Sequence, residues 1–291
     1  MATAPISWGI CEVPGWGVQL PVERVLSEMS AMGFPATELG SDGYLPSDPA
    51  ELRSVLGPYN LDLLAAFVPA VVHDPEQADE TLRRMTEMAE LLQAVGATYF
   101  NTAAVTSWDW EPRRELTDAE WDHTMHMFAR IEEITEAHGL MQVLHEHVGC
   151  VIETKDEIQR VVDHSAIRFV LDTAHFAVGG YDPVDFVAAH PDRVGLVHIK
   201  DCRLDVAQKL NDGEISLMEA VQQGIFPPVG EGDLDIEQVI TVLEAGGYEG
   251  WYVLEQDAAI TGEVPAPGEG PIEDVVISVN YLKGLEERLA S

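Results

Sequence analysis

The sequence predicts an α/β fold, and within that class a (β/α)8 TIM barrel formed as a single domain over residues 1–291. Short apolar runs rich in β-branched and aromatic residues alternate eight times with longer segments of helical period, which is typical of parallel strands joined by helices. No GxGxxG turn follows the first run, and no change in composition divides the chain. Closure into a barrel is therefore favoured over an open doubly wound sheet.

The expected elements follow this alternation along the chain. The strands are expected at residues 4–10, 36–40, 61–68, 97–104, 140–147, 167–172, 194–200 and 250–256. The helices are expected at 21–32, 48–56, 76–94, 117–138, 154–163, 183–189, 235–245 and 271–289, several of them opening on Asp, Thr or Pro and closing on Gly. A long insertion at 202–230 follows the seventh strand, and a Pro/Gly-rich loop at 262–271 follows the eighth.

The charge of the chain limits its partners. The formal net charge is -35, from 51 Asp and Glu against 16 Lys and Arg. Such a field repels phosphate backbones and anionic membrane surfaces, so we expect neither nucleic acid nor a membrane as a partner. We interpret the acidic excess as a solvated surface, and the oligomeric state is left open, a homo-oligomer included.

The cysteines and the first residues indicate the compartment. Cys11, Cys150 and Cys202 are odd in number and form no CxxC pair, so neither a disulfide framework nor a thiolate zinc site is expected. The chain opens without a basic region followed by an apolar one, and it contains no run of eighteen apolar residues. These features favour a protein of the cytoplasm.

Polar residues end four of the expected strands, at the barrel end where chemistry takes place in this fold. They are His145, Glu146 and His147 in the fifth strand, Asp172 with His175 in the sixth, His198 with Lys200 in the seventh, and Glu255 in the eighth. Carboxylates and imidazoles without thiolates suit Mn²⁺, Co²⁺, Mg²⁺ or Zn²⁺. One such residue alone is often a helix cap, but the joint pattern predicts a metal site.

Alternation along the strands leaves one ligand open. His145 and His147 share a face of the fifth strand while Glu146 faces the other side, so either His145 or Glu146 is the ligand. Lys200 shares a face with His198 and is expected to bind a substrate oxygen or stabilise an enolate, although it could be a surface lysine.

Trp8, Trp108 and Arg203 are the candidates for binding substrate. Packing is the default interpretation for the tryptophans in or after the first and fourth strands, although aromatic side chains at the rim could cover the apolar face of a sugar-like ring.

Seven segments spread over the chain resemble a known group of enzymes. They are ISWG at 6–9, TELGSDGYLP at 37–46, HEHVG at 145–149, LDTAH at 171–175, VHIKDCR at 197–203, GIFPPVGEGDLD at 224–235 and GWYVLEQD at 250–257. On these segments the chain resembles the xylose-isomerase-like barrel superfamily of sugar isomerases, epimerases and dehydratases, and within it most closely the inosose dehydratases.

The resemblance implies a metal site and a reaction. One divalent ion, with Mn²⁺ or Co²⁺ favoured over Mg²⁺ or Zn²⁺, would be held by Asp172, His198, Glu255 and a ligand from the fifth strand. Matching Gly149 to the glycine of the family pattern places His145 at that fourth position, with Glu146 beside it. The implied reaction is dehydration of a keto-inositol, 2-keto-myo-inositol (scyllo-inosose), in inositol catabolism.

Dehydration of such a ketone proceeds through an enediolate and requires a base and an acid. Lys200 is expected to contribute positive charge, and Glu38, His147 and His175 are the unranked candidates for proton transfer. No nicotinamide, flavin or phosphate-binding loop is evident, so the reaction is expected to be redox-neutral.

Four other functions agree with parts of this sequence pattern. Isomerisation or 3-epimerisation of a free ketose uses the same metal and enediolate, and β-elimination from a 3-keto-glycoside would need room along residues 202–230. Phosphodiester cleavage needs more metal ligands and a cationic groove, which the acidic balance disfavours. A non-catalytic barrel is disfavoured because all four strand ends keep residues able to bind a metal.

Overall fold

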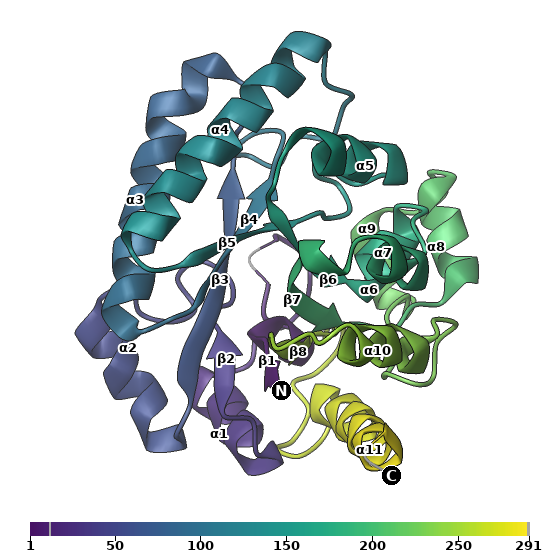
Figure 1. The fold of residues 1–291 in the computed structure, drawn as a ribbon. Coiled ribbons are helices and arrows are strands. Elements are labelled where there is room, and N and C mark those ends of the chain that lie inside the picture. Colours follow the sequence, from purple (N-terminus) through teal and green to yellow (C-terminus); the bar gives the residue numbers. More distant parts are fainter. Residues whose placement is uncertain (12, 290–291) are drawn as a thin grey trace.

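The computed structural model describes residues 1–11 and 13–289 and contains a closed barrel of parallel strands in chain order (Figure 1). The strands are β1 (Ala2–Thr3), β2 (Ala36–Glu38), β3 (Asp62–Ala70), β4 (Tyr99–Ala104), β5 (Met141–His145), β6 (Arg168–Asp172), β7 (Val194–Ile199) and β8 (Tyr252–Leu254). β1 pairs with β2 on one side and with β8 on the other, which closes the cylinder. The predicted TIM barrel is confirmed.

Eight helices of the described chain correspond to the predicted ones. They are α1 (Val22–Met32), α2 (Pro49–Leu56), α3 (Ala78–Val95), α4 (Asp118–Ala137), α5 (Lys155–His164), α7 (Pro183–Ala189), α10 (Ile236–Ala245) and α11 (Pro271–Leu289). Local sequence sets several of their starts: Thr117 and Thr154 each form a capping box with the Glu three residues later. No helix among the described residues is both long and apolar enough to cross a membrane.

The first strand departs from its prediction. A strand was expected over residues 4–10, but β1 ends at Thr3 and Pro5–Trp8 form a 3-10 helix that ends at Gly9, whose φ is 80°. Pro5 fixes its own φ and has no N–H to donate to a strand ladder, while Gly9 accepts the left-handed backbone that ends the turn. The segment therefore leaves the barrel wall before Trp8.

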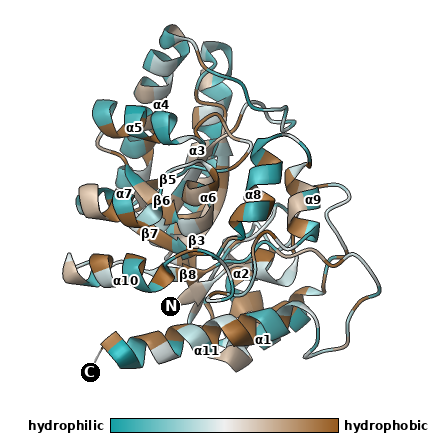
Figure 2. Ribbon diagram, turned by 90° about the vertical axis from the view of Figure 1, so that its right-hand side faces the viewer, coloured by the Kyte–Doolittle hydropathy of each residue, from teal (hydrophilic) through white to brown (hydrophobic). Residues whose placement is uncertain are grey.

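Three helices were not predicted, and two of them lie in the expected insertion. α6 (Thr173–Val178) follows β6 directly, and α8 (Leu204–Asn211) and α9 (Leu217–Gln222) follow β7. α8 and α9 lie side by side and contact each other (Figure 2). Val206, Ala220, Ile225 and Phe226 belong to a second apolar cluster, which also contains residues outside the insertion such as Ala174 of α6, so the insertion packs onto the barrel end.

The barrel interior has an apolar layer below a polar one. Near the middle of the strands the inward side chains are apolar: Ala36, Val143, Val170, Leu196 and Val253. Because strand side chains alternate with a period of two, the next inward position lies two residues further on. These next positions are Glu38, His145, Asp172, His198 and Glu255, at or just beyond the C-terminal ends of β2, β5, β6, β7 and β8. The fold thus gathers one polar residue from each of five strands.

Candidate active site

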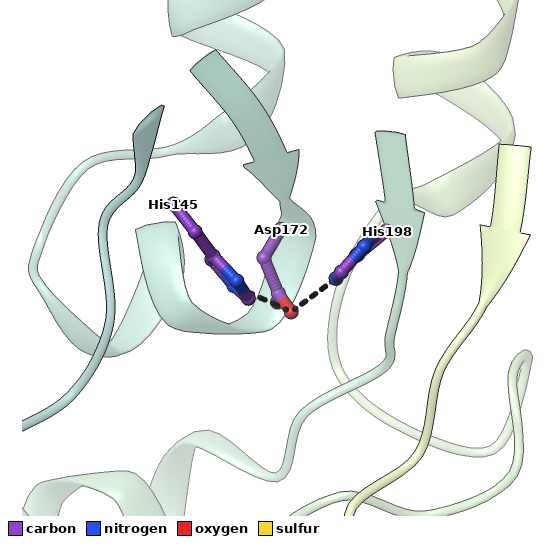
Figure 3. Close-up of side chains that lie close together, drawn as sticks. All are labelled: His145, Asp172 and His198. Atoms are coloured by element: carbon purple, nitrogen blue, oxygen red, sulfur yellow. Dashed lines mark ion pairs between the residues drawn. The ribbon is translucent and has the colours of Figure 1, made fainter. Parts of the chain in front are cut away.

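Three of these polar residues, from three neighbouring strands, point toward one another (Figure 3). Asp172 Oδ2 lies 3.6 Å from His145 Nε2 and 3.8 Å from His198 Nδ1. The other oxygen of the same carboxylate, Oδ1, accepts hydrogen bonds from the backbone N–H groups of Ala174 and His175. Asp172 therefore caps α6 with one oxygen and directs the other at the two imidazoles.

His198 is held between two carboxylates. Its Nε2 lies 2.9 Å from Glu38 Oε1, and its Nδ1 lies 3.1 Å from Glu255 Oε2. Burial alone would lower the pKa of His198, but Glu255 and Glu38 raise it well above its ordinary value. Glu38 fixes the orientation of the ring from behind, as outer carboxylates do for metal-binding histidines, and leaves Nδ1 directed at Asp172 and Glu255.

Lys200 is fully buried beside this cluster. Its Nζ donates to Glu255 Oε1 and Asp257 Oδ1, both at 2.7 Å, and lies 3.1 Å from Asp172 Oδ2. Burial alone would lower the pKa of Lys200, but Asp172, Asp257 and Glu255 raise it well above its ordinary value. Likewise burial would raise the pKa of Asp172, yet Lys200 and His175 hold it well below its ordinary value. The centre therefore contains a charged ammonium among carboxylates.

The donor atoms of the cluster fit a divalent ion. Among the described residues, no hydrogen bond of good geometry reaches either ring nitrogen of His145, Asp172 Oδ2 or His198 Nδ1. Buried polar atoms are nearly always hydrogen-bonded unless a ligand satisfies them. Ligand atoms of His145, Asp172 and His198 all lie within 4.8 Å of one another, as do those of Glu38, His198 and Glu255. Nitrogen and oxygen donors at this spacing suit Mn²⁺, Co²⁺ or Zn²⁺.

The structure brings His145, and not Glu146, to this cluster. Glu146 is fully buried as well, but it belongs to none of the groups of converging ligand atoms, and neither of its oxygens has a hydrogen-bond partner among the described residues. Burial raises its pKa well above the ordinary value. The ring centroids of His145 and His147 lie 5.3 Å apart, as expected for two residues on the same face of the fifth strand.

His147 and His175 form a second group together with Asp257, again with all ligand atoms within 4.8 Å. His147 Nδ1 lies 2.8 Å from the carbonyl oxygen of Val148, so we place the proton on Nδ1 and leave Nε2 unprotonated. Burial, followed by the neighbouring His145, lowers the pKa of His147 to about 4. Burial likewise lowers the pKa of His175 well below its ordinary value. Both imidazoles are therefore neutral at neutral pH.

Of the predicted substrate-binding residues, Trp8 is a wrong assignment. It is 0% exposed in the outer core, and its Nε1 donates to Glu28 of α1 at 2.8 Å. The reason is the early end of β1, which turns Trp8 away from the rim.

Trp108 and Arg203, the other two predicted substrate-binding residues, both make structural contacts. Trp108 Nε1 donates to Gln77 Oε1, and Arg84 stacks 4.1 Å above the ring. Arg203 is exposed and donates to the carbonyl oxygen of Gly224. Their assignment to substrate stays a prediction.

Two aromatic residues that the sequence analysis did not single out as substrate-binding lie beside the histidines. Phe67, on β3, packs edge-on against His145 and His147 at centroid distances of 5.7 and 5.6 Å. Trp110 stacks on Phe67 at 6.2 Å with 42% of its surface exposed and φ at 55°, a backbone conformation that is uncommon for a bulky residue. Alternation along β3 could have indicated that Phe67 faces inward, and the place of Trp110 just after the fourth expected strand agrees with a position near the rim.

A hollow of about 640 Å³ lies elsewhere, lined by residues of α1, α10 and α11 and by Tyr252 of β8. Its lining is mainly apolar, with only Glu244, Lys283 and Glu286 as charged members. The buried ionisable groups with strongly shifted pKa values converge at the strand ends and not in this hollow, so the strand-end cluster is the stronger candidate for chemistry.

Comparisons with known proteins agree with this arrangement. The sequence profile of the xylose isomerase-like TIM barrel family matches residues 26–276. The inosose dehydratase of Geobacillus kaustophilus (strain HTA426) is 34% identical over 271 residues, which cover 88% of this chain and 87% of that protein.

Two solved structures share the fold at low identity. An L-ribulose 3-epimerase superposes with a TM-score of 0.72 at 15% identity, covering 100% of this chain and 97% of its own. The IOLI protein, in a structure with a bound zinc atom, superposes with a TM-score of 0.70 at 14% identity, covering 98% of each chain.

Proposed function

This chain belongs to the xylose isomerase-like TIM barrel family, and within it we propose that the chain is a metal-dependent hydro-lyase that dehydrates a keto-inositol. The observation that carries the proposal is the buried cluster of His145, Asp172, His198 and Glu255, whose donor atoms face one another at the C-terminal ends of four strands. Similarity to an inosose dehydratase over 88% of the chain supports the choice of reaction.

His145, Asp172, His198 and Glu255 would hold the ion, with Glu38 fixing the His198 ring from behind. The zinc atom in the IOLI protein, which has the same fold, supports a divalent ion here, and the nitrogen and oxygen donors suit Mn²⁺, Co²⁺ or Zn²⁺. Among these ions we propose Mn²⁺ or Co²⁺, as the family resemblance implies. A bound divalent ion supplies an electrophile that polarises a ketone oxygen. Lys200 adds a fixed positive charge next to the same carboxylates.

Among the three candidates for proton transfer, contacts favour His147. Glu38 is committed to His198 Nε2, and His175 Nε2 lies 3.3 Å from the Lys200 ammonium. His147 is only partly buried and keeps an unprotonated Nε2, because its Nδ1–H is taken by the Val148 carbonyl oxygen. We assign His147 to remove the proton next to the ketone and to return it to the departing hydroxyl, which leaves as water.

The aromatic pair Phe67 and Trp110 would cover the C–H face of the substrate ring. Phe67 lies against both His145 and His147, so a ring bound next to these histidines meets its aromatic surface. A polyhydroxylated cyclohexanone has both an apolar C–H surface and hydroxyl groups that can bind to a metal ion. The substrate class is therefore a small polyol ketone.

The test is dehydration by the stripped and reloaded enzyme. Treatment with a chelator should abolish formation of the ultraviolet-absorbing dione from 2-keto-myo-inositol, and addition of Mn²⁺ or Co²⁺ should restore it. Full activity without metal contradicts the metal site. Isomerisation or epimerisation of free ketoses without any dione would instead assign the chain to the isomerase side of its family.

A variant separates proton transfer from metal binding. His147→Gln should lower kcat by about 10²- to 10⁴-fold, the usual contribution of a positioned acid or base, while Mn²⁺ affinity measured by calorimetry stays unchanged. His126→Gln, on the outer helix α4, is the matched control and should alter neither quantity. A loss of Mn²⁺ binding in His147→Gln would make this histidine a ligand and not the base.

A further inference from the structure

Lys200 occupies the centre of the polar layer in contact with both groups of possible metal ligands. Its Nζ lies 3.1 Å from Asp172 of the first group, and 2.7 and 3.3 Å from Asp257 and His175 of the second. The ring of Phe226 lies 5.2 Å from the same atom. The Lys200 backbone is fixed as well, since its N–H donates to Thr173 Oγ1 and its carbonyl oxygen accepts from that hydroxyl.

The second group, His147, His175 and Asp257, has a donor set that divalent ions commonly take. Two imidazoles and one carboxylate, with ligand atoms within 4.8 Å, match three-residue metal sites that leave positions for water or substrate. The two groups adjoin, because the ring centroids of His145 and His175 are 5.6 Å apart and those of His147 and His175 are 4.1 Å apart. By geometry alone the polar layer could hold two ions.

We propose that the Lys200 ammonium is a built-in cation that fills this second site and so restricts the centre to one divalent ion. A divalent ion held by His175 and Asp257 would lie close to the ammonium and would be repelled by it in a buried setting. Lys200 also already satisfies Asp257 and has its Nζ next to His175 Nε2. With the second site filled from within, His147 Nε2 stays free of metal and available for proton transfer.

Charge balance gives the reason for a lysine at this position. Asp172, Glu255 and Asp257 are all buried around Nζ, and buried carboxylates require a counter-charge. Removal of the ammonium would leave three carboxylates and two imidazoles around a vacated volume, a setting that recruits a cation. The inference depends on the proposed metal site and does not depend on the identity of the substrate.

Counting bound Mn²⁺ tests it without any measurement of activity. The metal-free wild-type protein, titrated with Mn²⁺ and followed by calorimetry and elemental analysis, should bind one ion per chain. Lys200→Met, whose side chain ends at the position of the lysine Cε and therefore frees the position of the ammonium, should bind two and should give an electron paramagnetic resonance spectrum of two coupled Mn²⁺ ions. Two ions in the wild type, or one in Lys200→Met, would overturn the inference.

Further variants locate the second ion. Lys200→Met combined with Asp257→Asn should return to one Mn²⁺ per chain, whereas Lys200→Arg, which keeps a cation, should stay at one. Should Lys200→Met fail to fold, bound Mn²⁺ is counted instead in Lys200→Ala refolded in Mn²⁺. Added methylammonium should then displace the second ion from this variant. A second ion that persists in the double variant, or that methylammonium does not displace, contradicts the assignment to His147, His175 and Asp257.

The metal count also separates this inference from the proposed function. A wild-type protein that binds no Mn²⁺ rejects the metal site on which both depend. One ion in the wild type and two in Lys200→Met uphold the role of Lys200 even if keto-inositol is not dehydrated.

Discussion

The two layers inside the barrel are built on the same strands and differ completely in chemistry. Val143 and His145 lie two residues apart on β5, and Leu196 and His198 have the same relation on β7. The lower layer is closely packed: a Cβ on Gly195 would lie 2.5 Å from Val143 Cγ1, so the glycine makes room for the valine. The upper layer instead contains ring nitrogens and a carboxylate oxygen without good hydrogen bonds.

The difference shows how the barrel separates stability from function. Each buried polar group left without a partner costs about 1–3 kcal/mol, so the upper layer is a local source of instability in the metal-free protein. The apolar layer one pleat below offsets that cost and holds the strand ends in fixed positions. Changes in the lower layer should therefore affect stability, and changes in the upper layer should affect metal binding and catalysis.

The largest effect on activity should come from one of two alanine substitutions on β5, one in the polar layer and one in the apolar layer. His145→Ala should lower kcat/KM by at least about 100-fold through loss of metal, because removal even of outer partners of a ligand costs 10–100-fold. Val143→Ala should leave kcat/KM of the folded protein nearly unchanged and lower the free energy of unfolding by about 1–3 kcal/mol. Kinetics at saturating Mn²⁺ and denaturant unfolding measure the two quantities. Equal losses of kcat/KM in both variants would contradict the division of stability and catalysis between the two layers.

A smaller effect, on Mn²⁺ affinity, should follow from Glu38→Gln. This substitution keeps a hydrogen-bond partner for His198 and removes the negative charge of the Glu38 carboxylate. We expect Mn²⁺ affinity to fall by about 10- to 100-fold, with kcat recovering at saturating Mn²⁺, because Glu38 acts through His198. Glu28→Gln, outside the barrel beneath Trp8, is the control and should leave Mn²⁺ affinity unchanged. A kcat that stays low at saturating Mn²⁺ would identify Glu38 as the acid or base instead.

The smallest effect on activity should come from substitutions in the aromatic pair Phe67 and Trp110. Phe67→Ala should raise KM by about 2- to 10-fold, the value of one aromatic contact, with a minor change in kcat. Trp110→Gly should also raise KM, and it should stabilise the protein by relieving the positive φ, which costs about 1–3 kcal/mol in a non-glycine residue.

Trp108→Phe is the control for the substitutions in the aromatic pair. It removes the hydrogen bond to Gln77 and should reduce stability without raising KM. A rise in KM for Trp108→Phe larger than that for Phe67→Ala would move the substrate toward Trp108.

Sequence alone determined the barrel and the strand ends that carry the proposed metal ligands. Alternating apolar runs and helical segments are local patterns, and strand period fixes which residues share a face, so Asp172, His198 and Glu255 could be placed on one rim. The same period reduced the strand-five ligand to His145 or Glu146. The prediction of the first strand over residues 4–10 is wrong because Pro5 and Gly9 determine the backbone conformation there. The apolar pattern of so short a segment does not distinguish a strand from a 3-10 turn.

Tertiary structure alone decided how the strand ends combine. Contacts between residues far apart in the chain, such as Glu38 with His198 and Lys200 with Asp257, depend on barrel closure and register, which no local pattern contains. Closure of the barrel brings Glu38 into contact with His198 Nε2, and it places the ammonium of Lys200 among three carboxylates. The physical reason is that alternation gives the direction of a side chain, whereas distances across the barrel come only from the packing of all eight strands.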